Sequence, residues 1–147
     1  MIPFVIIDSN VVAKWFFPEV LTEKALALRK DWQVGAIELI APELLLLEVS
    51  HVISQKKRTH FITPDESRTT LQNLLFLDIP TVAIYPLLAT AHEMTIVFEL
   101  TLDDALYLAL AQELGGKFIT ADPWLYHSLR LKIDFIEFLE NYKSMAQ

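Results

Sequence analysis

The sequence predicts an α/β fold, a three-layer α/β/α sandwich with a mostly parallel central sheet. Short, mainly apolar runs at Phe4–Ile7 and Lys117–Thr120 have the composition of strands that are buried on both faces. Helical segments with recognisable caps separate such runs, and this alternation favours a parallel sheet covered on both sides. The 147 residues contain no linker, repeat or low-complexity tract, so we expect one domain spanning residues 1–147.

The first 60 residues alternate strands with helices. Prolines mark two helix boundaries, because Pro18 ends the first helix and Pro42 opens the third. The expected elements are a strand at residues 4–7, helices at 11–17 and 22–33, a strand at 37–41, and a helix from Pro42 and Glu43 to about residue 58.

The remaining residues carry further start and stop signals. Thr63 and Glu66 form a capping box that starts one helix. Thr101 or Asp103 can cap another helix, which Gly115 ends. The expected elements are a helix from 63 to about 76, a short strand at 79–85 weakened by Pro80, helices at 86–97 and 101–114, a strand at 117–120, a helix from Asp122 and Pro123 to 129, a strand at 132–136, and a helix or frayed tail from 137.

The overall charge excludes nucleic-acid binding by bulk attraction. Twelve Lys and Arg against 19 Asp and Glu give a net charge of −7, which is the wrong sign for such binding. A nucleic-acid substrate would therefore need a local basic patch and metal ions. The one basic run, Lys56-Lys57-Arg58, is explained most simply by its favourable interaction with a helix dipole.

The composition also bears on assembly and location. Hydrophobic residues make up 53% of the chain, and this surplus predicts a homodimer or a dedicated partner chain. The chain has no cysteine, its apolar N-terminus lacks the basic segment of a signal peptide, and no apolar run reaches membrane-spanning length. We expect a cytoplasmic protein.

Acidic residues recur where α/β folds place their functional sites. Asp8 and Asp122 follow predicted strands, and Asp103 and Asp104 begin a buried helix. Helix capping is the simple alternative for each, with Ser9 and Asn10 as rival caps for Asp8. Glu48 lies in the middle of a helix among apolar neighbours, where no cap is needed.

A cluster of these acids would require a cation or raised pKa values. Two carboxylates about 4 Å apart repel by ~4 kcal/mol at an effective dielectric near 20. Oxygen-only ligation, with no cysteine and no spaced histidine motif, favours Mg²⁺ or Mn²⁺. Metal-activated phosphodiester hydrolysis is the chemistry that such a site suits. The four histidines, His51, His60, His92 and His127, show no ligand spacing.

Four motifs in order resemble the PIN domain family, and within it the VapC-like ribonuclease toxins of type II toxin–antitoxin systems. The resemblance covers nearly the whole chain. It rests on the run Ile7-Asp8-Ser9-Asn10 and its continuation to Phe16, on residues 42–52 with Glu48, on Asp104-Ala105-Leu106-Tyr107 and its continuation to Ala111, and on Ile119-Thr120-Ala121-Asp122.

The resemblance implies a Mg²⁺- or Mn²⁺-dependent endoribonuclease that is usually a homodimer and is inhibited by a VapB-like antitoxin. It selects Asp104 over Asp103. It implies that the catalytic and metal-binding residues are Asp8, Glu48, Asp104 and Asp122, and that Ser9, Asn10 and Thr120 contact ligands or the scissile phosphate.

Alternative functions remain open from the sequence. His51 replaces an asparagine that the family often has, and Pro123-Trp124 follows the last acid where polar or basic residues are usual. A catalytically impaired PIN-like module that binds protein or RNA is therefore an alternative. A haloacid-dehalogenase-like phosphatase would need a second aspartate where Asn10 stands, and a receiver domain would place its acidic pair near the first strand.

Overall fold

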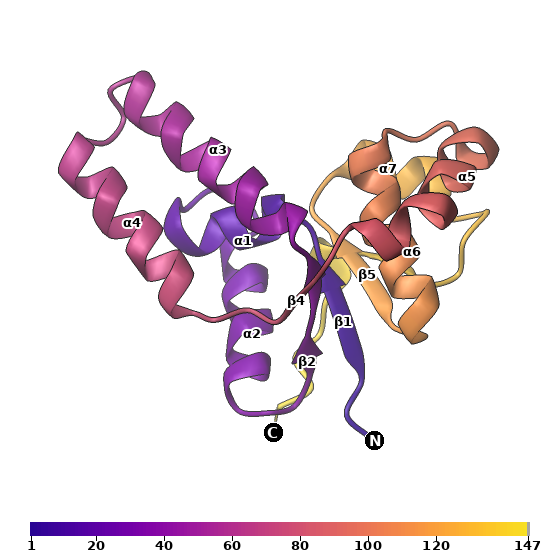
Figure 1. The fold of residues 1–147 in the computed structure, drawn as a ribbon. Coiled ribbons are helices and arrows are strands. Elements are labelled where there is room, and N and C mark those ends of the chain that lie inside the picture. Colours follow the sequence, from indigo (N-terminus) through magenta and orange to yellow (C-terminus); the bar gives the residue numbers. More distant parts are fainter. Residues whose placement is uncertain (147) are drawn as a thin grey trace.

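The computed structural model describes residues 1–146, and a four-stranded parallel sheet lies at its centre (Figure 1). The strands are β1 (Phe4–Ile7), β2 (Glu38–Leu39), β5 (Lys117–Thr120) and β6 (Ile136–Phe138). Their order is β2-β1-β5-β6, and every neighbouring pair is parallel. The carboxyl ends of all four strands therefore meet at one edge of the sheet.

Helices cover the sheet on both sides, as the sequence predicts. Helices α1 (Ser9–Phe16) and α2 (Thr22–Gln33) lie on one side. Helices α5 (Leu88–Phe98), α6 (Leu102–Leu114) and α7 (Pro123–Leu129) lie on the other (Figure 1). The three-layer α/β/α sandwich is thus confirmed.

Helix α6 is the most deeply buried helix of the sandwich. All of residues 105–111 are buried, because α6 packs against β1 and β5 on one face and against α5 on another. Its ends match the sequence signals: Thr101 Oγ1 accepts a hydrogen bond from the Asp104 amide, and Gly115 ends the helix at a φ of 64°. Asp103 is therefore left free of the capping role.

Helices α3 (Leu44–Arg58) and α4 (Pro64–Phe76) form an antiparallel pair, here called the α3–α4 arm, that extends from the sandwich (Figure 1). The predicted capping box starts α4. A second, two-stranded parallel sheet of β3 (Ala41–Pro42) and β4 (Thr81–Val82) joins the two ends of the arm. The arm is thus anchored at its base.

Two predicted strands are wrong in extent. The strand expected at residues 37–41 divides into β2 and β3, because Ile40 marks the point at which the chain leaves the main sheet. Pro42 then lies in β3, so α3 begins at Leu44. The segment expected at 79–85 contributes only β4, and a 3₁₀ helix follows it at Tyr85–Leu87 before α5.

The C-terminal prediction is also wrong. The last strand is β6 and not residues 132–136, because residues 130–135 form the turn after α7. A 3₁₀ helix at Leu139–Asn141 follows. The remaining tail is held in place and not frayed, since the buried Asp31 carboxylate accepts hydrogen bonds from groups on four tail residues: Tyr142, Ser144, Met145 and Ala146.

The Asp31 carboxylate is stable in its charged form. Burial alone would raise its pKa, but the hydrogen bonds from the tail more than offset this effect, and the pKa is lowered. Within residues 1–146, no helix has both the length and the apolar character needed to cross a bilayer.

Gly116, in the connection between α6 and β5, offers a direct test of the packing of this connection against β1. A Cβ at this position would lie 2.8 Å from the Phe4 carbonyl oxygen. We expect Gly116→Ala to lower the free energy of unfolding by about 1–3 kcal/mol, because the backbone of β1 must shift. Gly115→Ala is the matched control: its Cβ meets nothing within 4 Å, and only the left-handed backbone opposes it. Urea unfolding that shows Gly115→Ala as the costlier change would contradict this packing.

Candidate active site

Asp8 and Thr120 join the carboxyl ends of the two central strands. Asp8 follows β1 and is 6% exposed, and Thr120 ends β5 and is fully buried. Thr120 Oγ1 donates a hydrogen bond of 2.5 Å to Asp8 Oδ2. Asp8 Oδ1 accepts a second one from the Val11 amide, so Asp8 also caps α1. The capping and site interpretations of Asp8 are therefore compatible, and the rival caps Ser9 and Asn10 do not take that role.

Glu48 lies in the second turn of α3 and is held by a residue of another helix. Tyr107 Oη donates a hydrogen bond of 2.5 Å to Glu48 Oε1, and the tyrosine is 1% exposed. The Tyr107 ring stacks on Phe118 of β5 with their centroids 5.8 Å apart. This hydrogen bond joins α3 to α6. Tyr107 thus fixes the position of Glu48 relative to α6.

Asp104 and Asp122 complete the group of predicted acids. Asp104 lies in the first turn of α6, three residues before Tyr107, so both side chains lie on one side of the helix. Asp122 caps α7, and its Oδ1 accepts hydrogen bonds from the amides of Trp124 and Leu125. The Asp122 amide itself donates to Thr120 Oγ1 at 3.0 Å. A single hydroxyl therefore connects Asp8 to Asp122.

The pKa values show that these carboxylates are electrostatically coupled. Burial raises the pKa of Asp8 to about 7, and the charges of Asp104 and Glu48 add to this rise, while hydrogen bonds from Thr120 and Val11 oppose it. Burial is also the main cause of the raised pKa of Glu48 and of Asp104. Asp103 and Asp104 raise the pKa of Glu48 further, and Asp122 does so for Asp104.

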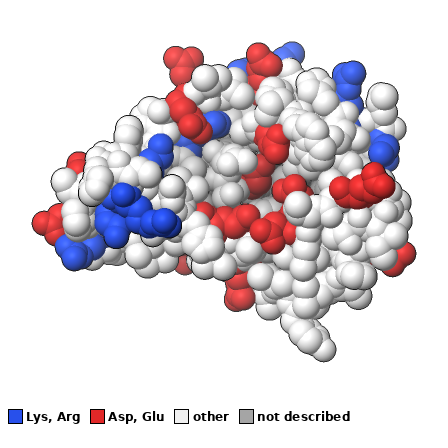
Figure 2. All heavy atoms as spheres, turned by 90° about the horizontal axis from the view of Figure 1, so that it is seen from above, with Lys and Arg blue, Asp and Glu red and all other residues white. Residues whose placement is uncertain are grey.

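No basic side chain of residues 1–146 forms an ion pair with any of the four acids. The described salt bridges all lie elsewhere, at Lys14–Glu19, Arg68–Asp65 and Lys117–Glu137. Figure 2 shows acidic side chains gathered around a hollow. This hollow lies on the face of the molecule above the carboxyl ends of the strands. The negative charge of this hollow is thus not neutralised by the protein.

The donor set of the hollow fits a hard divalent cation. Its donors are carboxylate oxygens, with the Ser9 hydroxyl beside Glu48, and the sequence contains no cysteine. Among the residues described, no three Asp, Glu or His side chains are already arranged to hold a metal ion. The fit therefore lies in the chemistry and charge of the donors and not in a closed ligand cage.

Most of the predicted site residues come together, and Asn10 is the exception. The Ser9 hydroxyl favours the charged form of Glu48, although less strongly than Tyr107 does. Asn10 is exposed and makes no side-chain hydrogen bond within residues 1–146. Sequence reasoning missed Tyr107 as a contributor to the site. Its spacing of three residues from Asp104 on one helix is the signal that could have identified it.

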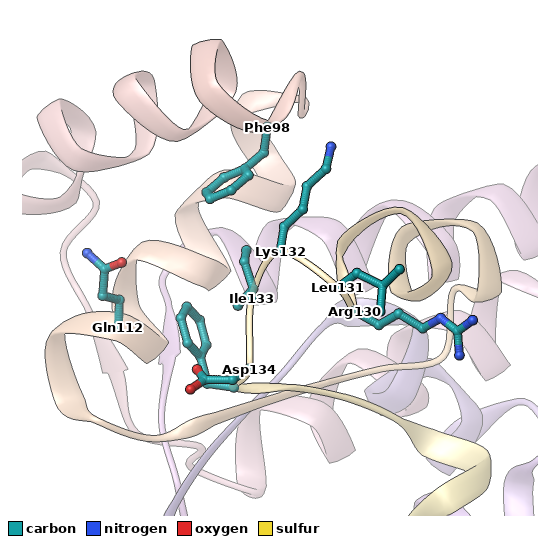
Figure 3. Close-up of a pocket in the computed structure, with 8 residues that line it drawn as sticks. Phe98, Gln112, Arg130, Leu131, Lys132, Ile133 and Asp134 are labelled. Carbon is teal, nitrogen blue, oxygen red and sulfur yellow. The ribbon is translucent and has the colours of Figure 1, made fainter.

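A second hollow, of about 410 Å³, lies on the turn after α7 (Figure 3). Phe98, Gln112, Leu131 and Asp134 are among the residues that line it, and none of the predicted acids does. Its two basic side chains, Arg130 and Lys132, point in different directions and do not converge on one position. This hollow is therefore a weaker candidate for a functional site than the acidic one.

A family profile described as the PIN domain matches residues 5–127. The chain belongs to the PIN domain family. The four acids and Thr120 all lie within the matched part. The same part includes the α3–α4 arm.

This PIN domain is similar to a curated protein and to solved structures. It is 27% identical over 122 residues to the protein named ribonuclease VapC3 of Pyrobaculum aerophilum, covering 82% of this chain and 90% of that protein. A Klebsiella pneumoniae toxin–antitoxin complex contains a similar chain, at a TM-score of 0.61 and 18% identity, covering 92% of this chain and 97% of that one. The crystal structure of PAE2754 from Pyrobaculum aerophilum gives a TM-score of 0.64 at 17% identity, covering 95% of this chain and 90% of that one. The predicted resemblance is thereby confirmed.

The raised pKa of Asp8 predicts how the stability of the metal-free PIN domain varies with pH. Because the folded-state pKa of about 7 lies above the ordinary 3.8, the folded protein keeps a proton that the unfolded chain loses between these values. The contribution of Asp8 to the free energy of unfolding should then fall by about 4 kcal/mol as pH rises from about 4 to 7. Asp8→Asn retains a capping side chain and should show a smaller fall. Urea unfolding in chelator measures both.

The control for this experiment is Asp134→Asn, which changes an exposed acid outside the group. It should show the same pH dependence as the wild-type protein. At pH 8 in chelator, Asp8→Asn should be more stable than either. An Asp8→Asn variant that loses stability in parallel with wild type over this range would show that Asp8 does not titrate there.

The Tyr107–Glu48 hydrogen bond makes a second prediction. Tyr107→Phe keeps the ring on Phe118 but removes the donor that lowers the pKa of Glu48, so this pKa should rise further. Carboxyl ¹³C chemical shifts of Glu48 in the metal-free protein measure the change. Tyr126→Phe is the control, since its hydroxyl makes no hydrogen bond within residues 1–146. An unchanged Glu48 titration in Tyr107→Phe would contradict the described hydrogen bond.

Proposed function

We propose that this PIN domain is a metal-dependent endoribonuclease that hydrolyses RNA phosphodiester bonds. The observation that carries the proposal is the coupled group of Asp8, Glu48, Asp104 and Asp122, which has no basic counter-ion within residues 1–146. Burial of unneutralised carboxylates is costly, and a function that uses their charge accounts for it. The name of the VapC3 relative supports RNA as the substrate.

These four acids would hold Mg²⁺ or Mn²⁺, directly or through water. When bound, such an ion lowers the pKa of a water molecule and stabilises the negative charge that develops on the phosphate. The carboxylates supply the oxygen donors that both ions prefer. The raised pKa values of Asp8, Glu48 and Asp104 describe the protein without the ion, and a nearby cation would lower them again.

The surrounding residues have distinct positioning roles. The Thr120 hydroxyl fixes Asp8, and the Tyr107 hydroxyl fixes Glu48 through Oε1. Tyr107 does not bond Glu48 Oε2, and we propose that this oxygen orients the attacking water and accepts its proton. The raised pKa of Tyr107 keeps its hydroxyl protonated and therefore able to donate. Ser9, Asn10 and Thr120 are the proposed contacts to ligands or to the scissile phosphate.

Water as the nucleophile determines the products. It attacks phosphorus directly, so the ribose 2′-hydroxyl of the substrate takes no part in bond cleavage. The products would carry a phosphate on one end and a free hydroxyl on the other. A 2′,3′-cyclic phosphate end would require attack by the 2′-hydroxyl and would contradict this mechanism.

We also propose the biological setting of this activity. The chain would be the toxin of a VapBC-type pair, in the cytoplasm, bound by a VapB-like antitoxin and forming a homodimer. The toxin–antitoxin complex of Klebsiella pneumoniae supports the pairing. Exposed apolar side chains such as Phe76, Ile96 and Val97, each more than 60% exposed, support further interfaces. Residues 1–147 would act as one domain, because β1 and β6 share one sheet.

Asp104 and its neighbour provide a matched test of this function. Asp104→Asn keeps the shape of the side chain but removes its charge from the hollow. We expect cleavage of RNA in Mn²⁺ to fall at least about 100-fold, more than is usual for the loss of a residue that only supports a metal ligand. Asp103→Asn is the control, because Asp103 is exposed and is not one of the four proposed ligands, and it removes a neighbouring charge that also acts on Glu48. It should retain most of the activity.

Three measurements complete this test. Cleavage should stop in chelator and return with added Mn²⁺. Sequencing and mass analysis of the fragment ends should show no 2′,3′-cyclic phosphate. If Asp104→Asn cleaves as fast as wild type, the activity comes from a contaminating nuclease, and the alternative of a catalytically impaired binding module is favoured.

A further inference from the structure

The last turn of α3 carries three consecutive basic residues, Lys56, Lys57 and Arg58, at the outer end of the α3–α4 arm. They are a quarter of the 12 Lys and Arg in a chain whose net charge is −7. Interaction with the helix dipole accounts for basic residues at a helix end. The helix dipole does not account for the exposed aromatic ring and the hollow that lie beside this turn.

A hollow of about 520 Å³ opens beside this turn. Lys57, Arg58, His60 and Phe61 contribute to its lining, and we call these four residues the basic platform. The Phe61 side chain is 67% exposed, which is unusual for so large an apolar ring. Lys56 Nζ lies 4.5 Å from the centroid of this ring and adds positive charge next to it. The platform thus combines cations with an accessible aromatic surface.

The charges of the platform are available to a ligand. Lys57 and Arg58 form no ion pair within residues 1–146, where the described salt bridges involve other residues. Glu66 also lines the hollow, but its Oε1 accepts a hydrogen bond of 2.8 Å from the Thr63 amide in the capping box. The one acid at the hollow is therefore engaged in holding the start of α4.

Helix α3 connects the acidic hollow to the platform, because it carries Glu48 in its second turn and Lys57 and Arg58 in its last. Figure 2 shows a group of Lys and Arg side chains on the arm, on the same face as the acids. Glu48 and Lys57 lie nine residues apart on α3, which is roughly 14 Å along the helix axis, and their side chains leave opposite sides of the helix. A stacked nucleic-acid strand covers this distance with about four nucleotides, at ~3.4 Å for each.

We propose that the basic platform binds single-stranded RNA a few nucleotides from the bond that is cut. Lys57 and Arg58 would contact phosphates, and Phe61 would stack on one base. This inference rests on the proposed endoribonuclease function and deepens it, because it locates the attraction for RNA that the acidic hollow cannot supply. It also explains how a protein with net negative charge holds a polyanion.

The test is binding of a short labelled single-stranded RNA, measured by fluorescence anisotropy in chelator at several salt concentrations. The double variant Lys57→Gln/Arg58→Gln should weaken binding and reduce the slope of log K against log salt by about 1.4, or ~0.7 for each phosphate that the variant no longer neutralises. Phe61→Leu should weaken binding about tenfold and leave the slope unchanged, because stacking is not an ionic interaction.

The matched control is Lys30→Gln/Lys132→Gln, which removes the same charge from exposed positions outside the arm. It should bind RNA as the wild-type protein does. Equal weakening by both double variants would mean that only bulk charge matters, and would overturn the proposal. Unchanged binding by Phe61→Leu, or a wild-type protein that does not bind the RNA at all, would also overturn it.

Failure of the inference and failure of the proposed function are distinguishable. If the wild-type protein cleaves RNA but the platform variants bind RNA normally, the platform proposal fails and the function stands. If the platform variants lose binding but the wild-type protein cleaves nothing in Mn²⁺, the endoribonuclease proposal fails alone. In an active enzyme, the double variant should raise KM more than it lowers kcat.

Discussion

The hydrogen bond between Thr120 and Asp8 connects the strand pairing of this fold to its acidic hollow. It joins the carboxyl ends of β5 and β1, two strands that are adjacent in the sheet but 112 residues apart in sequence. Parallel pairing brings these ends to one edge, and the buried hydroxyl then bonds Asp8 Oδ2, while the Val11 amide bonds Oδ1. The same oxygen accepts the amide of Asp122. The position of two acids thus follows from the sheet.

The arrangement concentrates negative charge and thereby lowers stability. Asp8, Glu48 and Asp104 all have raised pKa values, mainly because they are buried, and partly because they face one another. Asp31 is the instructive contrast within the same chain. It is also buried, but hydrogen bonds from the C-terminal tail stabilise its charge and its pKa is lowered. The protein can therefore stabilise a buried carboxylate when it serves only structure, whereas the hydrogen bonds to Asp8 and Glu48 do not offset the effect of burial on their pKa values.

The sequence predicts most of the fold because its local signals agree with the tertiary packing. The capping threonine and the terminal glycine define α6, and the capping box defines the start of α4. The errors in the predicted strands come from segments whose composition stays apolar while the backbone stops bonding one strand and turns to another. Residues 37–41 pass from one sheet to another, and residues 130–135 are a turn that reaches β5 at its end, where the Phe135 carbonyl accepts a hydrogen bond from the Phe118 amide. Composition does not report hydrogen-bond partners.

Asp8, Asp104 and Asp122 were predictable because their positions at strand ends and helix starts follow from topology, whereas Glu48 was predicted from its place among apolar neighbours in a helix and from the family resemblance. Tyr107 was missed because its hydrogen bond with Glu48 spans 59 residues and joins two helices whose relative placement the sequence does not state. The central claim, that the coupled carboxylates form a cation site, is tested most directly by a crystal structure with Mn²⁺ and its anomalous scattering. The account predicts an anomalous peak between the carboxylates of Asp8 and Asp104. A crystal saturated with Mn²⁺ whose anomalous peaks all lie away from this edge of the sheet would contradict it.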